Sequence, residues 1–551
     1  AVAGRWDSLF SGAARRELEA WLPTYVAGRR WFGHKARRIT SATVLDAVTV
    51  PDRGDGANGA REARPPVACV LVVQLELDHD PPERYLLPLA YATGAEADEV
   101  RRWHPDAVVA DVRSADEDGV VIDAVHAPGF VRAMADLLAR RRTLSGSAGQ
   151  LTGVPHAGLR RLHLCTGAEC PTTPLSGEQS NTSVLLGDEA ILKFVRRMET
   201  GVNPGVEVAQ FLAEHPAPTP RFGGSIEYRR HGASESATVG ILEELVANEE
   251  DGWDYVVDAL THGLEESLAN PRGADAPSVV LSRGVVTPLA EDPEAAHPLV
   301  GPHLQWASLL GRRTAELHLA LVSDVGHPDF APEPLTSLDR QALFHGARSL
   351  TRQVLADLAD DGVDSPLVSE VVRRGAEVAE RLRRLTSGAP GAYRIRCHGD
   401  FHLGQVLWTG KDFVLIDFEG EPSRSLAWRR LKRPAAVDLA GMLRSIHYAG
   451  EAAARRIDQG FGPTLEQGDE ARHHEWVALW RTSVGACFLE SYLGLASQSP
   501  YLPASADELD PLLDFFTLEK AVAELRYEAN SRPTWVDLPA KGILDLLDAE
   551  P

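Results

Sequence analysis

Apolar positions in the first part of the chain follow two different patterns. Residues 11–31 place apolar side chains at helical spacing, whereas residues 67–77 and 85–91 are nearly continuous apolar runs with polar ends. The first pattern is typical of an amphipathic helix, and the second is typical of buried strands. Helical spacing returns just before residue 144. We therefore predict an N-terminal α/β domain over residues 1–144.

The pattern changes again after this domain. Residues 145–176 are rich in Gly, Thr and Pro, which predicts a linker. Residues 177–247 combine strand-like runs with one helix, and residues 248–551 are dominated by helical patterns. Within this last part, residues 397–422 contain short apolar runs around a turn, which predicts a hairpin. The predicted order is an α/β domain, a linker, a small strand-rich lobe and a large helical lobe.

Composition excludes several classes of protein. The chain has 551 residues, of which 44% are hydrophobic and 25% charged, as in ordinary globular proteins. A net charge of -23 without long runs of one sign disfavours nucleic acid as a partner. We find no signal-peptide pattern and no apolar run long enough to span a membrane, so we expect a cytoplasmic protein without a membrane partner.

The predicted hairpin contains a motif whose residue types and spacing have known roles in catalysis. It reads CHGDFHLGQVLWTGKDFVLIDFEGEP, with Asp400 five residues before Gln405 and Asp417 twelve residues after it. In protein kinases the catalytic loop H-R-D-x-x-x-x-N has the same spacing between acid and amide, and D-F-G supplies a further carboxylate. The alternative is that the two acids only cap turns, where Asp is common.

Phosphoryl transfer explains why these residue types would occur together. Mg²⁺ prefers hard oxygen ligands, and a carboxylate orients the hydroxyl that attacks the phosphorus. We therefore predict that Gln405 and Asp417 bind Mg²⁺ and that Asp400 is the catalytic base or the acidic residue that orients the attacking hydroxyl. This makes ATP and Mg²⁺ the expected cofactors.

A kinase also needs a cation on the nucleotide phosphates. Lys193 lies within the apolar run AILKFV, where a buried ammonium must find a partner or reach solvent. Glu207, in the following predicted helix, is the expected partner. The alternative is that Lys193 extends to solvent.

Two other segments are candidates for nucleotide contacts. Polar residues directly before this strand could offer hydroxyls and amides to phosphate. They are Ser180, Asn181, Thr182 and Ser183. The run ILEELV precedes the helical lobe, and we expect it to contact adenine through the backbone of Glu244 and Val246.

Taken in order, several stretches resemble one family. They include RRWFGHKARRI, EQSNTSVLLGDEAILKFVRRMETGVNP, the hairpin above and DLAGMLRSIHYA. The chain resembles the maltokinase family of bacterial sugar kinases, in the aminoglycoside-phosphotransferase-like branch of the kinase fold. This resemblance implies an α+β, bilobal, protein-kinase-like fold with an N-terminal α/β cap domain. It also implies a small-molecule sugar as partner and transfer of the ATP γ-phosphate to the anomeric hydroxyl of maltose, giving maltose 1-phosphate. We expect a monomer or homodimer.

Departures from the family pattern leave the identity of the acceptor sugar undecided. His34 replaces a glycine, and Trp428 replaces an acidic residue before an arginine pair. Related kinases phosphorylate glucosamine to glucosamine 6-phosphate, and the fold also includes aminoglycoside phosphotransferases. A non-enzymatic alternative is a pseudokinase that assembles enzymes of glucan metabolism.

The expected acceptor pocket is acidic. Carboxylates favour a protonated amine in a partly dry pocket, although the same acids could instead pair with nearby arginines. The predicted substrate residues are His402, Glu419, Glu421, Asp438 and Arg444.

Overall fold

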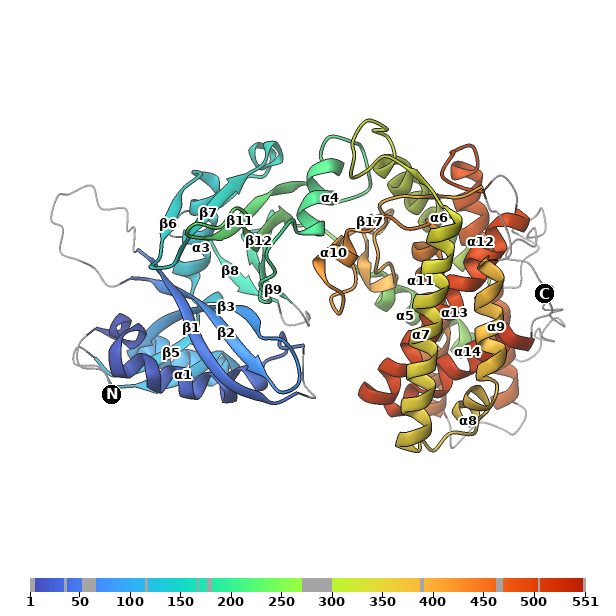
Figure 1. Cartoon of the computed structure of the whole chain (residues 1–551), viewed down its shortest axis with the longest axis horizontal. Helices are drawn as coiled ribbons and strands as arrows, with labels where there is room; N and C mark the ends of the chain where they lie inside the picture. The colour runs from blue at the N-terminus through green and yellow to red at the C-terminus, as the bar shows by residue number, and fades with distance from the viewer. Residues whose placement is uncertain are drawn as a thin grey trace. The chain divides into compact units, whose positions relative to one another are not determined.

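The structure is a computed structural model that divides the chain into two compact units. The first comprises Ala1–Ala213, Pro220–Val246 and Pro422–Leu426, and the second comprises Glu214–Thr219, Ala247–Glu421 and Ala427–Pro551. The described residues are 5–33, 37–51, 66–113, 117–165, 167, 169–175, 181–269, 300–386, 391–461, 469–503 and 506–548. Figure 1 shows that strands dominate the first unit and helices the second.

The first unit contains a five-stranded antiparallel sheet in the order β1-β2-β3-β5-β4. Its strands are β1 (Ile39–Val50), β2 (Ala68–Leu77), β3 (Glu83–Thr93), β4 (Val108–Val112) and β5 (Gly119–Asp123), with helices α1 (Gly12–Ala27), α2 (Gly94–Trp103) and α3 (Pro128–Ala139). Leu71 and Val73 of β2 belong to the core that includes α1, and Val70 and Val72 to the core that includes α3. Burial on both faces explains the nearly continuous apolar run of β2.

A seven-stranded antiparallel sheet completes this unit in the order β6-β7-β11-β12-β10-β9-β8. Its strands are β6 (Thr143–Ser145), β7 (Gly149–Pro155), β8 (Thr172–Pro174), β9 (Asn181–Leu186), β10 (Ala190–Val195), β11 (Phe222–Arg230) and β12 (Ala237–Glu244), with helix α4 (Pro204–Leu212).

The segment predicted as a linker therefore contributes strands to this sheet. Glycine suggested a loop in this segment, but at one position packing requires it. A Cβ on Gly153 of β7 would lie 2.3 Å from the carbonyl oxygen of Leu137 in α3. Only glycine allows the strand to pass so close to the helix.

The two sheets of the first unit are joined by buried polar contacts. Asp46 of β1 accepts hydrogen bonds from the backbone N–H groups of Ser147 and Ala148 and from the Tyr228 hydroxyl of β11. Arg196, just after β10, forms a buried ion pair of 2.8 Å with Asp123 of β5. The apolar core is also shared, because Val72 and Phe194 belong to one cluster.

The second unit is a helical bundle that holds a small hairpin. Its helices are α5 (Gly252–Ala269), α6 (Gly301–Leu321), α7 (Ser337–Asp361), α8 (Pro366–Arg373), α9 (Gly375–Arg383), α11 (Ala436–Phe461), α12 (Asp469–Ala496), α13 (Ala506–Ser531) and α14 (Asp537–Asp548), and the short α10 (Leu426–Arg429) lies at the unit boundary. Among the described helices, none is both long and apolar enough to cross a membrane.

The hairpin predicted within residues 397–422 is present. Strands β16 (Val406–Trp408) and β17 (Phe413–Leu415) pair antiparallel, and β13 (Glu250–Asp251) adds a third strand beside β16. The turn between β16 and β17 includes Gly410 with φ 81°, a conformation that favours glycine. The remaining strands, β14 (Glu333–Pro334) and β15 (Tyr393–Arg394), form a separate pair.

Candidate active site

The hairpin of the second unit brings the predicted metal ligands together. Gln405 ends a short 3-10 turn, Leu403–Gln405, directly before β16, and Asp417 follows β17. The Gln405 side-chain amide donates a hydrogen bond of 3.4 Å to Oδ2 of Asp417. An amide and a carboxylate in contact are a donor set that fits Mg²⁺, since both offer hard oxygen atoms.

The backbone around this pair adopts unusual conformations. Asp417 has φ 66°, in the left-handed region that few residues other than glycine occupy. Gly399 and Gly420 also have positive φ, at 84° and 70°. A Cβ on Gly399 would lie 3.5 Å from the Cα of Gly420, so the loop that carries Asp400 and the loop after Asp417 are in close contact.

Asp400 is partly exposed and is paired with a lysine from a distant helix. Its side chain is 21% exposed, and Nζ of Lys520 in α13 donates to its Oδ1 at 3.3 Å. Burial alone would raise the pKa of Asp400, but the charges of Lys520, His402 and His398 together lower the pKa below its ordinary value. Asp400 is therefore a carboxylate at neutral pH.

Lys520 was missed in the sequence, although a signal was present. It lies in α13 beside the buried residues Leu518, Ala521 and Val522. A lysine among apolar residues is the same kind of signal that singled out Lys193, although the Lys520 side chain, at 38% exposure, also reaches solvent. The partner could not be named because it lies 120 residues away.

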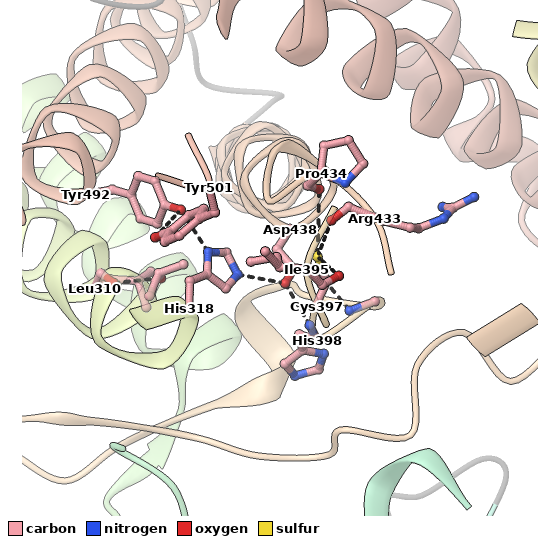
Figure 2. A network of polar contacts seen from close by, with 12 residues as sticks. Leu310, His318, Ile395, Cys397, His398, Arg433, Pro434, Asp438, Tyr492 and Tyr501 are labelled. Atoms are coloured by element: carbon pink, nitrogen blue, oxygen red, sulfur yellow. Dashed lines mark hydrogen bonds and ion pairs between the residues drawn. The ribbon is translucent and has the colours of Figure 1, made fainter. Parts of the chain in front are cut away.

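The loop that carries Asp400 is held in place by Asp438 of α11. Its carboxylate accepts hydrogen bonds from the backbone N–H groups of His398, at 2.7 Å, and Gly399, at 2.9 Å. Its Oδ2 also lies 3.0 Å from Nε2 of His318 in α6 (Figure 2). Burial would raise the pKa of Asp438, but these bonds and the nearby histidine charges lower the pKa.

This placement corrects the predicted role of Asp438 as a sugar ligand. The residue is only 1% exposed, and both carboxylate oxygens are occupied by protein donors. Asp438 therefore positions the loop that carries Asp400. Its position at the start of a helix, well after the motif, left this role open in the sequence.

A chain of hydrogen bonds continues from Asp438 into the bundle (Figure 2). Nδ1 of His318 lies 2.8 Å from the Tyr492 hydroxyl, which lies 3.2 Å from the Tyr501 hydroxyl. With Nε2 on the carboxylate of Asp438 and Nδ1 on the Tyr492 hydroxyl, both ring nitrogens of His318 have a partner. Tyr492 and Tyr501 thereby fix the ring orientation of His318.

Arg444 is buried and is paired with a residue of the protein rather than exposed to a sugar. It is 3% exposed, and its Nε and Nη2 donate to Oε2 of Glu524 at 2.9 and 2.6 Å. Gly542 of α14 packs against it, since a Cβ there would lie 2.4 Å from its Nη1. The predicted substrate role is therefore wrong for this residue, which joins α11 to α13 and α14 instead.

The other predicted substrate residues surround the loop. Nδ1 of His402 accepts from the backbone N–H of Gly404, and its Nε2 lies 3.5 Å from the Gln405 side-chain nitrogen. Burial is the main cause that lowers the pKa of His402. Glu419 and Glu421 are partly exposed, and the charge of Glu421 acts on Lys520. Their contacts with a sugar stay predictions.

In the first unit, Lys193 lies on the strand predicted for it. Its Nζ forms an ion pair of 3.2 Å with Glu243 of the neighbouring strand β12. Glu243 was not singled out in the sequence, and the pairing predicted with Glu207 stays a prediction. Ser183 is directly opposite Lys193 in the register of β9 and β10, and Asn181 is opposite Val195, so both share its face of the sheet.

Thr182 faces the other side of the sheet. It is opposite Phe194 in the register, and its hydroxyl accepts a hydrogen bond of 2.9 Å from Nε of Arg196. This placement contradicts a phosphate contact from the same surface as Lys193. Ser180 lies outside the described residues.

The run ILEELV, which was predicted to contact adenine, ends where the chain passes from the first unit to the second, at Val246 and Ala247. The backbone N–H of Glu244 donates to the carbonyl of Arg221, and its carboxylate pairs with the same arginine at 3.2 Å. Val246 has no backbone hydrogen bond to any residue in the described part of the chain. The N–H of Glu244 is therefore occupied, and an adenine contact of Val246 stays a prediction.

Comparison with protein families identifies two regions of the chain. The family model of the maltokinase N-terminal cap domain matches residues 21–126, and that of the phosphotransferase enzyme family matches residues 290–476. Glucosamine kinase from Streptacidiphilus jiangxiensis is 28% identical over 401 residues, which cover 70% of this chain and 76% of that protein. Glucosamine kinase from Mycolicibacterium smegmatis is 24% identical over 446 residues, covering 81% and 94%.

Solved structures agree on the fold. A glucosamine kinase in complex with glucosamine, ADP and inorganic phosphate has a TM-score of 0.56 at 20% identity, with 95% of this chain and 99% of that chain covered. A second crystal form of glucosamine kinase has a TM-score of 0.59 at 20% identity, with the same coverage. The likeness confirms the predicted kinase-like fold with an N-terminal cap domain.

Proposed function

Because the chain combines a maltokinase N-terminal cap domain with a domain of the phosphotransferase enzyme family, we propose that it is an ATP-dependent sugar kinase with glucosamine as its acceptor. The observation that carries this proposal is the contact between Gln405 and Asp417 beside the loop of Asp400. These side chains are the ones that phosphoryl transfer requires, on a rigid hairpin.

Each residue has a distinct task in the proposed reaction. Gln405 and Asp417 would hold Mg²⁺, which neutralises charge on the nucleotide phosphates when bound. Asp400 orients the acceptor hydroxyl and accepts its proton as the bond from that oxygen to the γ-phosphorus forms and the bond to ADP breaks. Lys193 supplies positive charge to the phosphates, and Asp438 keeps the loop in place through the backbone of His398 and Gly399.

Glucosamine is favoured over maltose for two reasons. The two relatives described above are named glucosamine kinases. In addition, the carboxylates of Asp400 and Glu421 both act on the ammonium of Lys520, and carboxylates beside the loop of Asp400 suit a cationic sugar. Maltose is the second candidate, because the cap domain matches that of maltokinases.

The catalytic assignment is tested by Asp400→Asn. The variant keeps the shape of the side chain but loses the carboxylate, so we expect phosphoryl transfer to fall by at least about 100-fold. Binding of ADP, measured by calorimetry, should stay at the wild-type value. Turnover within about threefold of wild type would overturn the role of Asp400.

The acceptor is tested by comparing kcat/KM for glucosamine, glucose, maltose and an aminoglycoside, with ADP release as the readout. Glucose is the matched control because it lacks the amine. We expect glucosamine to have the highest value and to yield glucosamine 6-phosphate in ³¹P NMR. A higher value for maltose, with an anomeric phosphate in the product, would instead identify a maltokinase.

A further inference from the structure

We propose that Lys520 of α13 is a positioning residue for phosphoryl transfer, which holds one oxygen of Asp400 and leaves the other for the acceptor hydroxyl. The proposal rests on the role of Asp400 given above. Nζ of Lys520 lies 3.3 Å from Oδ1. Oδ2 accepts no hydrogen bond from the described residues, so it is available to a substrate.

The surroundings of Lys520 keep it charged. Burial would lower its pKa, but the carboxylates of Asp400, Glu524 and Glu421 together raise its pKa above the ordinary value. Asp400 in turn faces the charges of Lys520, His402 and His398. The pair is therefore an ammonium and a carboxylate near neutral pH.

The position of Lys520 is set by helix docking. Glu524 lies one turn further along α13 and accepts from Nε and Nη2 of the buried Arg444 in α11. Gly542 of α14 lies against the same guanidinium. These contacts fix α13 relative to α11, so the lysine reaches Asp400 from a rigid element.

This arrangement defines how Asp400 acts. A carboxylate beside a fixed cation is held ionised and accepts a proton only late in the reaction. Such a group orients the hydroxyl rather than deprotonating it early, which suits the loose transition state of phosphoryl transfer. Lys520 itself forms and breaks no covalent bond.

A purely structural role is the competing explanation. The side chain of Lys520 is 38% exposed and that of Asp400 is 21% exposed. Ion pairs with such exposure add little to folding stability. If the pair served only stability, its loss would leave kcat and its pH dependence at their wild-type values.

The test compares Lys520→Met and Lys520→Arg with Lys411→Met, a control at an exposed lysine in the hairpin turn of the same unit. We expect Lys520→Met to lower kcat on the best acceptor about 100-fold, as small misplacements of catalytic groups do, with unchanged ADP affinity. The acidic limb of the kcat profile should move to higher pH, because Asp400 loses a neighbouring positive charge. Lys520→Arg should restore most of kcat, and the control should match wild type.

The outcomes separate this proposal from the proposed function. A wild-type protein that transfers phosphate to none of the sugars would overturn the proposed function and this role with it. If the wild type is active, wild-type kcat and pH profile in Lys520→Met would overturn the role alone. A lower kcat with an unshifted acidic limb and no rescue by arginine would also overturn it, since a structural lysine gives that result.

Discussion

At the scale of single residues, the candidate site depends on buried side chains that hold its loop in place. Asp438 uses both carboxylate oxygens to hold two consecutive backbone N–H groups of the catalytic loop. His318 is held in turn by Tyr492 through its other ring nitrogen. The position of Asp400 is therefore determined by residues from three helices and a loop.

Replacing Asp438 by Asn should reduce activity without removing nucleotide binding. The amide would direct a donor at a backbone N–H, and a buried unpaired donor costs about 1–3 kcal/mol. We expect kcat to fall by about 10- to 100-fold, while ADP affinity stays unchanged in calorimetry. Tyr492→Phe should give a smaller fall in kcat, because it removes only the hydroxyl that is hydrogen-bonded to His318.

A tyrosine of the same unit provides the control. Tyr527 of α13 is 50% exposed, so Tyr527→Phe should match wild type in both measurements. Wild-type kcat in Asp438→Asn would show that the loop does not need this carboxylate.

At the scale of elements, helix α11 packs directly against the loop that carries Asp400. A Cβ on Gly441 would lie 2.6 Å from the carbonyl oxygen of Phe401, the residue after Asp400. Such a distance is too short for any Cβ, and the neighbour is backbone that cannot rotate away. Glycine at this position therefore allows the helix and the loop to be in contact.

Gly441→Ala should displace the loop. We expect a loss of about 1–3 kcal/mol in the free energy of unfolding, measured with urea, and a fall in kcat of about 10- to 100-fold. Gly494→Ala in α12 is the matched control, since its added Cβ meets nothing within 4 Å. That variant should keep wild-type kcat and gain up to about 1 kcal/mol of stability.

How much could be predicted depends on how local each feature is. Asp400, Gln405 and Asp417 lie in one hairpin, so their spacing in the sequence was sufficient to predict that Gln405 and Asp417 lie close together. Thr182 was predicted to contact phosphate from the segment before the strand of Lys193, but it lies in a strand of its own, β9, where neighbouring residues face opposite sides. Lys520 and the role of Asp438 depend on helix docking, which no local pattern encodes.

At the scale of the whole molecule, the cap domain and the small lobe form one unit. Asp46 and the pair of Arg196 with Asp123 join their sheets with buried polar contacts, and one apolar core extends through both. The cap domain is therefore part of the folded core of the small lobe rather than an independent module.

Asp46→Asn tests the contact that Asp46 makes between the two sheets of the first unit. Hydrogen bonds from Ala148, Tyr228, Ser147 and Ala47 lower the pKa of Asp46, although burial opposes them. A carboxyl with a lowered pKa in the folded state stabilises the protein above about pH 4, its unfolded pKa, and loses this effect as the pH falls through the folded pKa. We expect the variant to lose about 1–3 kcal/mol at pH 7 in thermal denaturation, with the difference shrinking below about pH 4.

Asp98→Asn on α2 is the control for this measurement, because that carboxylate is 81% exposed. It should melt like wild type at pH 7. Equal thermal denaturation midpoints for Asp46→Asn and Asp98→Asn would show that the association of the two sheets does not depend on Asp46.

The ion pair of Asp400 with a lysine 120 residues later also has a consequence for biosynthesis. The ribosome produces the hairpin well before α12 and α13, which carry Tyr492 and Lys520. A nascent chain that ends just after the hairpin lacks Tyr492, which contacts His318, and Lys520, which is the cation beside Asp400. Maturation of the site is therefore delayed until the C-terminal helices have been synthesised and have docked.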